Sequence, residues 1–108
     1  PVAVHVPAAV PLEDAAAAGL RSLEHARTLP FACAQTGVRL RKAYALATEG
    51  KADLQQSYGL QNDPDFLASV ISSFDATRCD RAIARMKATG MVYVPTHVTR
   101  RLDAFAAQ

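Results

Sequence analysis

Short apolar runs alternate with helical patterns along this chain. Residues 1–5 carry valine at alternate positions, which suits a short buried strand. After two prolines, residues 11–18 form an alanine-rich helical pattern that Gly19 ends. A second apolar run follows over residues 20–24. A strand, a crossover helix and a second strand predict a βαβ unit, in which the two strands lie parallel in one sheet.

The same pattern returns near the end of the sequence. Residues 76–89 predict an amphipathic helix, and Gly90 follows as its end. The apolar face of this helix holds Cys79, Ala82, Ile83 and Met86. Residues 91–94 then give the strongest strand signal in the chain. Thr96 is placed to cap a last helix, whose apolar face holds Val98, Leu102, Phe105 and Ala106.

About fifty residues separate the second and third predicted strands, although connections in such units usually have only ~2–6 residues outside the helix. Residues 38–49 predict one helix, and the Asp-Pro pair at 63–64 predicts the start of another, with residues 58–62 as the turn between them. An apolar stripe follows at Phe66, Leu67, Val70, Ile71 and Phe74. We interpret residues 36–74 as a helical insertion within a single domain. We expect its stripe to pack against the other inserted helix or to form a lid over the carboxyl rim of the sheet.

Composition restricts the class of protein. The chain has 108 residues, of which 50% are apolar and 20% charged, so we expect one globular domain and no disordered tail. The net charge of +2 is dispersed and predicts no nucleic-acid binding, and no apolar run reaches the ~20 residues of a membrane helix. The sequence starts within a predicted strand, so we expect it to be a piece of a longer protein.

Two cysteines do not amount to a disulfide framework, and a cytoplasmic location is therefore the default prediction. Cys33 and Cys79 also lack the paired spacing of a structural zinc site. Because Cys79 falls on an apolar helix face, we interpret it as a core residue.

Two histidines follow the first two predicted strands. His5 and His25 end these strands, and parallel strands present their carboxyl ends at one rim, so the two side chains should lie side by side. Neutral imidazoles are common ligands of zinc. The pair is therefore a candidate metal site. The alternative is that each histidine is an ordinary strand-end residue with a satisfied hydrogen bond.

Other polar residues near this rim have two interpretations each. His97 follows the third predicted strand and is either a substrate contact or a surface residue at a helix start. Arg100 and Arg101 either bind a substrate carboxylate or lie on a solvated helix face. Glu24 precedes His25 and should pair with a basic neighbour.

Three segments resemble one known family. The runs VAVH (2–5), AGLRSLEH (18–25) and TGMVYVPT (89–96) resemble the fifth, sixth and seventh strands of the metal-dependent amidohydrolase superfamily, in particular its imidazolonepropionase-like and prolidase-like hydrolases. The resemblance covers about residues 1–35 and 75–108, and the insertion matches no motif.

The resemblance implies a (β/α)8 TIM barrel that holds one or two divalent metals, commonly zinc. It makes His5 the fifth-strand ligand and His25 the sixth-strand ligand. A His-x-His pair, a fourth-strand bridge and an eighth-strand aspartate would complete the family's site, and this chain has none of them. A whole barrel needs ~250 residues. We therefore expect a mostly helical α/β fragment with three parallel strands of a partial barrel.

The implied activity is hydrolysis of an amide, cyclic amide or dipeptide bond by a metal-bound hydroxide. Its partners would be a small amide or peptide-like substrate and further copies of the same chain in a homo-oligomer. The 108 residues alone are expected to be inactive, because they supply two of about five metal ligands. The alternative is a non-catalytic helical interaction domain, in which the strand assignments are wrong and the phenylalanine stripe is a docking face.

Overall fold

The computed structural model describes residues 3–25, 27–97 and 105, and within them the chain is mostly helical with a small parallel sheet. The strands are β1 (Ala3–Val4), β2 (Ser22–Glu24) and β3 (Val92–Val94). The helices are α1 (Leu12–Ala17), α2 (Thr28–Cys33), α3 (Gly37–Thr48), α4 (Leu54–Leu60), α5 (Pro64–Ser72) and α6 (Ala76–Thr89). Of the predicted helix after Thr96, only His97 and the exposed Phe105 are described, and both are helical.

The sheet has the order β1-β2-β3, and both strand pairs are parallel. Leu23 of β2 pairs with Val4 on one side and with Tyr93 on the other. The predicted βαβ unit is confirmed, with α1 as its crossover helix. The alternative of a helical interaction domain assumes that the strand assignments are wrong, and this assumption is contradicted by the sheet. In the part of the chain that the structure describes, these strands form an open sheet and no barrel.

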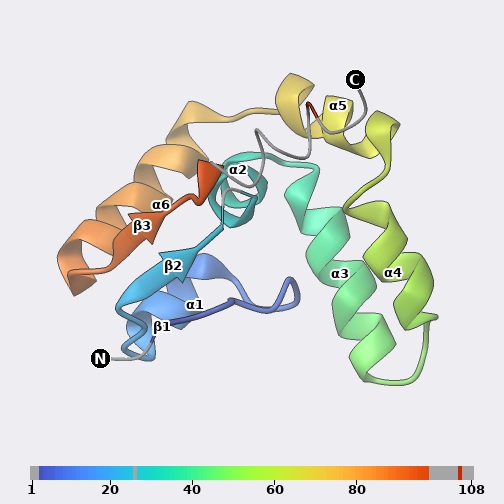
Figure 1. Cartoon of the computed structure of the whole chain (residues 1–108), viewed down its shortest axis with the longest axis horizontal. Helices are drawn as coiled ribbons and strands as arrows, with labels where there is room; N and C mark the ends of the chain where they lie inside the picture. The colour runs from blue at the N-terminus through green and yellow to red at the C-terminus, as the bar shows by residue number, and fades with distance from the viewer. Residues whose placement is uncertain (1–2, 26, 98–104, 106–108) are drawn as a thin grey trace.

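Helices α1 and α6 cover one face of this sheet (Figure 1). Leu23 has no exposed surface, and Tyr93 packs on the same side, whereas Val92 and Val94 are exposed. Alternate residues of a strand point to opposite faces, so the second face is open. The core under the helices is formed by Leu12, Ala16, Leu20, Leu23, Ala32, Ala82, Met86 and Met91. We call this group the sheet core.

Helix α6 matches the predicted bounds, and Gly90 ends it in the left-handed conformation with φ 69°. Ala82 and Met86 face the sheet core as predicted. Ile83 does not, because its side chain is 47% exposed. Ile83 is the residue after Ala82, so its side chain points away from the narrow stripe of α6 that contacts the sheet.

Helices α3, α4 and α5 lie to one side of the sheet, with α3 and α4 packed side by side (Figure 1). We call residues 37–72 the helical segment. A second cluster of buried residues, the segment core, consists of Ala34, Leu40, Phe66 and Val70. The predicted helix over 38–49 is confirmed. So is the start at 63–64, where the Asp63 carboxylate accepts a hydrogen bond from the Phe66 backbone N–H at 2.7 Å.

Two details of the helical segment differ from the prediction. The turn expected at 58–62 is wrong in part, because α4 continues to Leu60 and tolerates Gly59 in its interior. The apolar stripe of α5 is also narrower than predicted. Phe66 and Val70 are buried, but Ile71 is 79% and Phe74 60% exposed. One row of side chains four residues apart joins Ala34 and Leu40 in the segment core, and the next row does not.

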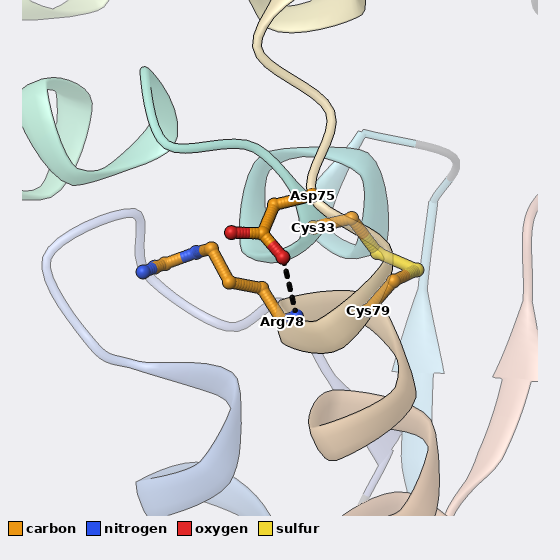
Figure 2. The surroundings of a disulfide bond; sticks show 4 residues. All are labelled: Cys33, Asp75, Arg78 and Cys79. Carbon is orange, nitrogen blue, oxygen red and sulfur yellow. Dashed lines mark hydrogen bonds between the residues drawn. A yellow bond between two sulfur atoms is a disulfide. The ribbon is translucent and has the colours of Figure 1, made fainter.

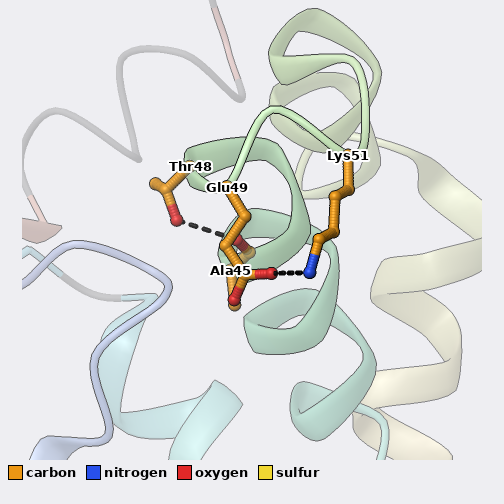
Figure 3. Close-up of polar contacts among 4 residues, drawn as sticks. All are labelled: Ala45, Thr48, Glu49 and Lys51. Carbon is orange, nitrogen blue, oxygen red and sulfur yellow. Dashed lines mark hydrogen bonds and ion pairs between the residues drawn. The ribbon is translucent and has the colours of Figure 1, made fainter.

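The end of α3 is fixed by local contacts (Figure 3). The Thr48 hydroxyl donates to the Ala45 carbonyl at 2.8 Å, and Lys51 lies 2.7 Å from the Glu49 carboxylate. Both charged side chains are more than half exposed, so water screens their attraction and this ion pair adds little stability.

A disulfide between Cys33 and Cys79 closes the base of the helical segment (Figure 2). The Asp75 backbone N–H donates to the Cys33 carbonyl at 2.9 Å, and the Gln35 N–H donates to the Ser73 carbonyl at 3.0 Å. We call residues 33–36 and 73–79 the neck. The interpretation of Cys79 as a core residue is corrected here, because its sulfur is bonded across the neck.

Disulfides persist mainly in oxidising compartments, so this bond removes the cysteine-based reason for a cytoplasmic location. The location stays a prediction. None of the described helices has the length and hydropathy that crossing a membrane would require.

Candidate functional site

The two predicted histidines lie together at the carboxyl ends of adjacent strands. His5 directly follows β1, and His25 directly follows β2. Their Nε2 atoms are 2.7 Å apart, and the rings stack with centroids 4.0 Å apart at an angle of 28°. The expectation that both side chains reach one rim of the sheet is confirmed.

The third strand positions His25. Its backbone N–H donates to the Val94 carbonyl at 2.9 Å, and its Nδ1 lies 3.1 Å from the Thr96 hydroxyl oxygen. His25 adopts φ 72°, a left-handed conformation that costs a non-glycine residue energy and is maintained here by these contacts. With Nδ1 engaged by Thr96, Nε2 faces His5. Metal-ligating histidines are commonly oriented in this way, through a hydrogen bond at the other ring nitrogen.

The geometry fits a metal in part. Tetrahedral zinc with Zn–N bonds of ~2.0–2.1 Å separates two ligating nitrogens by about 3.3 Å. At 2.7 Å, the His5 and His25 nitrogens are instead at hydrogen-bond distance, with one ring donating and the other accepting. A small opening of the pair would therefore admit an ion. Among residues 3–25, 27–97 and 105, no group of three or more His, Cys, Asp or Glu side chains could hold a metal. Catalytic zinc usually keeps three protein ligands, so the described chain supplies part of such a site.

His97, the other predicted site residue that the structure describes, is not brought to the pair. His97 is exposed and makes no hydrogen bond or ring contact with His5 or His25. Its role as a substrate contact stays a prediction. Glu24 accepts a hydrogen bond from the Ser22 hydroxyl, and not from the basic neighbour that we expected. Arg100 and Arg101 lie outside the described residues.

A cavity of about 500 Å³ separates the histidine pair from the helical segment. His5 and His25 line one side, while Arg41, Tyr44 and Tyr58 of α3 and α4 line another. Its volume is within the usual range of small-molecule sites. The helical segment therefore provides one wall of a cavity whose other wall is the carboxyl rim of the sheet.

Arg27 connects the two walls of the cavity. Its guanidinium donates to the Gln61 carbonyl at 3.0 Å and also hydrogen-bonds the Asn62 side-chain oxygen. Because Arg27 precedes α2 and the other two residues follow α4, this contact connects the end of β2 to the helical segment.

Tyr44 is a neutral polar group in the cavity wall. Burial, followed by the neighbouring Tyr58 phenol, raises the pKa of Tyr44 above its ordinary value. Its hydroxyl therefore stays protonated at neutral pH and can both donate and accept a hydrogen bond.

Sequence reasoning missed several residues of this site. We expect Thr96 to cap a helix, although its position two residues after β3 places it at the same rim as His25. Arg41 and Tyr44 lie three residues apart on a helix that the sequence predicted, so they share a face. No sequence pattern indicates that this face borders a cavity.

Comparison with protein-family models, with curated proteins and with solved structures finds no match to this chain. The resemblance to metal-dependent amidohydrolases therefore stays a prediction.

Proposed function

We propose that this chain is part of a metal-dependent amidohydrolase, in which His5 and His25 ligate a divalent metal, commonly zinc. The observation that carries the proposal is the approach of the two Nε2 atoms to 2.7 Å at the ends of adjacent parallel strands. Parallel α/β barrels have their active sites at this rim, because it collects side chains from several strands on a rigid base.

The open face of the sheet supports this assignment. Parallel sheets usually have both faces covered. Helices α1 and α6 cover one face, whereas the exposed Val92 and Val94 lie on the other. In the proposed barrel this second face points inward, and the remaining metal ligands come from other strands. The finer family assignment, to imidazolonepropionase-like or prolidase-like hydrolases, belongs to the same proposal.

The residues of this chain have separate tasks in the proposed reaction. A bound divalent metal would supply activated water and polarise the carbonyl of an amide, cyclic amide or dipeptide substrate. His5 and His25 hold the ion through Nε2. Thr96 and the Val94 carbonyl fix the orientation of His25. The cavity beside the pair admits a small substrate and limits its contact with bulk water.

The metal content of the full-length protein tests the proposal. We expect His5→Ala and His25→Ala each to lower bound metal and to abolish hydrolysis of amide, cyclic amide and dipeptide substrates while the fold persists. The matched control is His97→Ala, which removes an exposed imidazole and should leave the metal in place. Metal content is measured by elemental analysis, and the fold by circular dichroism. Full metal occupancy in both variants of the pair would rule out their role as ligands.

The 108-residue chain provides a second measurement. Two imidazoles leave a divalent ion largely hydrated, so we expect weak binding of zinc or manganese and no amidase turnover from this chain alone. If this chain alone shows metal-dependent turnover and His25→Ala abolishes it, the 108 residues complete a metal site by themselves.

A further inference from the structure

Two arginines of the cavity lining carry positive charge. Arg27 and Arg41 both line the cavity, and no aspartate or glutamate among the residues that the structure describes lines it with them. Arg27 is already bonded to Gln61 and Asn62. Arg41 is half-buried, and among the residues that the structure describes it has no hydrogen-bond or ion-pair partner. A partly desolvated guanidinium with unused N–H groups favours a bound anion, above all a carboxylate that can accept two parallel hydrogen bonds.

The rest of the cavity wall is suited to an apolar body. Leu12, Phe31 and Leu40 supply aliphatic and aromatic surface, and the neutral Tyr44 supplies one polar group. Ligand sites commonly combine such apolar walls with a few polar groups that fix orientation. This arrangement of apolar and polar side chains therefore favours a small molecule with an apolar part and one negative charge.

We propose that this cavity binds a small carboxylate with an apolar side chain, such as an N-acyl amino acid, with its carboxylate on Arg41 and its amide toward His5 and His25. The carboxylate site does not require a metal. Only the identification of the ligand as the substrate rests on the proposed function. The helical segment then sets the substrate class through Arg41, while the sheet supplies the histidine pair.

Binding of a charged and a neutral probe to the metal-free chain tests this proposal. The charged probe is N-acetyl-L-phenylalanine, and the neutral probe is its C-terminal amide, which has nearly the same shape but replaces one carboxylate oxygen by an uncharged NH2 donor. Dissociation constants are measured by NMR titration in the presence of a chelator. A hydrogen-bonded charge pair predicts about tenfold tighter binding of the carboxylate. Equal binding of the two probes, or binding of neither, overturns the proposal.

Two arginines of the same helix provide a matched pair of variants. Arg41→Gln should remove the preference for the carboxylate. Arg39→Gln removes the same charge from an exposed position of α3 that does not line the cavity. This variant should therefore still prefer the carboxylate probe. If Arg41→Gln fails to fold, Arg41→Lys decides, because it keeps the charge but loses the bidentate contact and should reduce the preference in part. An unchanged preference in the folded Arg41 variant overturns the proposal.

The outcome is separable from that of the metal test. If the chain prefers the carboxylate probe but His5→Ala and His25→Ala retain full metal, the two histidines are not metal ligands and the anion site stands. If the two variants lose metal but the chain shows no preference for the carboxylate probe, the histidines stand as ligands and the anion site is rejected.

Discussion

The sheet region and the helical segment are built in different ways. Among the described residues, the sheet core draws eight buried residues from β2, α1, α2, α6 and the positions just before β2 and β3, whereas the segment core has four. Several large apolar side chains of the helical segment and its surroundings are also exposed. Those exposed on or directly beside it are Val38, Leu54, Tyr58, Ile71 and Phe74. The sheet region thus has a core of its own, and the helical segment depends more on its attachments at the neck and at Arg27.

This difference matches the tasks that we propose for the two regions at the cavity. The histidines are on the part of the molecule with the larger core, where β3 fixes the backbone of His25. Arg41 and Tyr44 are on the part with the smaller core. A rigid base for chemistry beside a more adjustable wall for recognition is a common division in proteins.

Truncating one leucine in each core should give the largest effect. Leu23 is fully buried and Leu40 is 1% exposed, so the two start from equal burial. We expect Leu23→Ala to lower the free energy of unfolding by about 3–4 kcal/mol and Leu40→Ala by about 2–3 kcal/mol, because the smaller cluster can collapse around the cavity. Urea unfolding measures both. A larger loss from Leu40→Ala would reverse the proposed ranking of the two cores.

Removing the disulfide tests the attachment at the neck. Cys33 and Cys79 are 46 positions apart, so the bond restricts a long loop in the unfolded chain. We expect Cys33→Ser/Cys79→Ser to lower the free energy of unfolding by about 2–4 kcal/mol. Hydrogen exchange should rise more in α3 to α5 than in the sheet. Reductant should destabilise the wild type to the same extent and leave the double variant unchanged.

Gly37 tests the contact between α2 and the first turn of α3. A Cβ atom at this position would overlap the Phe31 carbonyl oxygen, a backbone atom that cannot rotate away. We expect Gly37→Ala to cost about 1–3 kcal/mol of stability.

The control is Gly59→Ala within α4, where a Cβ would meet no atom within 4 Å. It should stabilise the chain by about 0.5–1 kcal/mol, because alanine favours the helix. Equal effects of the two substitutions in thermal unfolding would show that Gly37 is not under steric constraint.

The smallest effect concerns the pH dependence of the neck. The backbone N–H of Arg78 donates to the Asp75 carboxylate at 3.0 Å (Figure 2). This bond, with help from the Gln35 side chain, the Thr77 N–H and the Arg78 charge, lowers the pKa of Asp75 below its ordinary value, although burial opposes the shift.

A carboxylate with a lowered pKa in the folded state stabilises the fold above its unfolded pKa of about 3.9. That contribution is lost as the pH falls through the folded pKa. We expect the wild type to be slightly more stable than Asp75→Asn at neutral pH and equal to it in acid. Thermal unfolding of both proteins across this range checks the prediction, and a constant difference would contradict it.

Local signals accounted for much of this fold. Gly19 and Gly90 mark where helices end, and both adopt positive φ. The Asp-Pro pair at 63–64 starts α5 through a cap made by a side chain near its own helix. The strands and the histidine pair followed from the order of elements, because a right-handed parallel crossover leaves few arrangements.

The missed features depend on contacts between distant parts of the chain. Helix α2 has no side-chain cap at Arg27, so its start carries no local signal. Helix α4 is short and mostly polar, and it forms against α3, where the Ser57 hydroxyl donates to the Ala43 carbonyl at 3.2 Å. The Cys33–Cys79 bond and the cavity around Arg41 depend on where two regions meet, which no local pattern encodes.

The geometry of the neck has a consequence for the history of such a chain. The Cα atoms of Cys33 and Cys79 are 4.2 Å apart, close to the ~3.8 Å between consecutive residues. Residues 34–78 thus form an excursion that leaves and rejoins the main path at nearly one point. The strands and both histidines lie outside this stretch, although the first turn of α6 lies within it, so an in-frame change between residues 36 and 74 would alter the helical segment and leave the strands and histidines in the chain. Recognition and chemistry would then evolve as separate parts of one polypeptide.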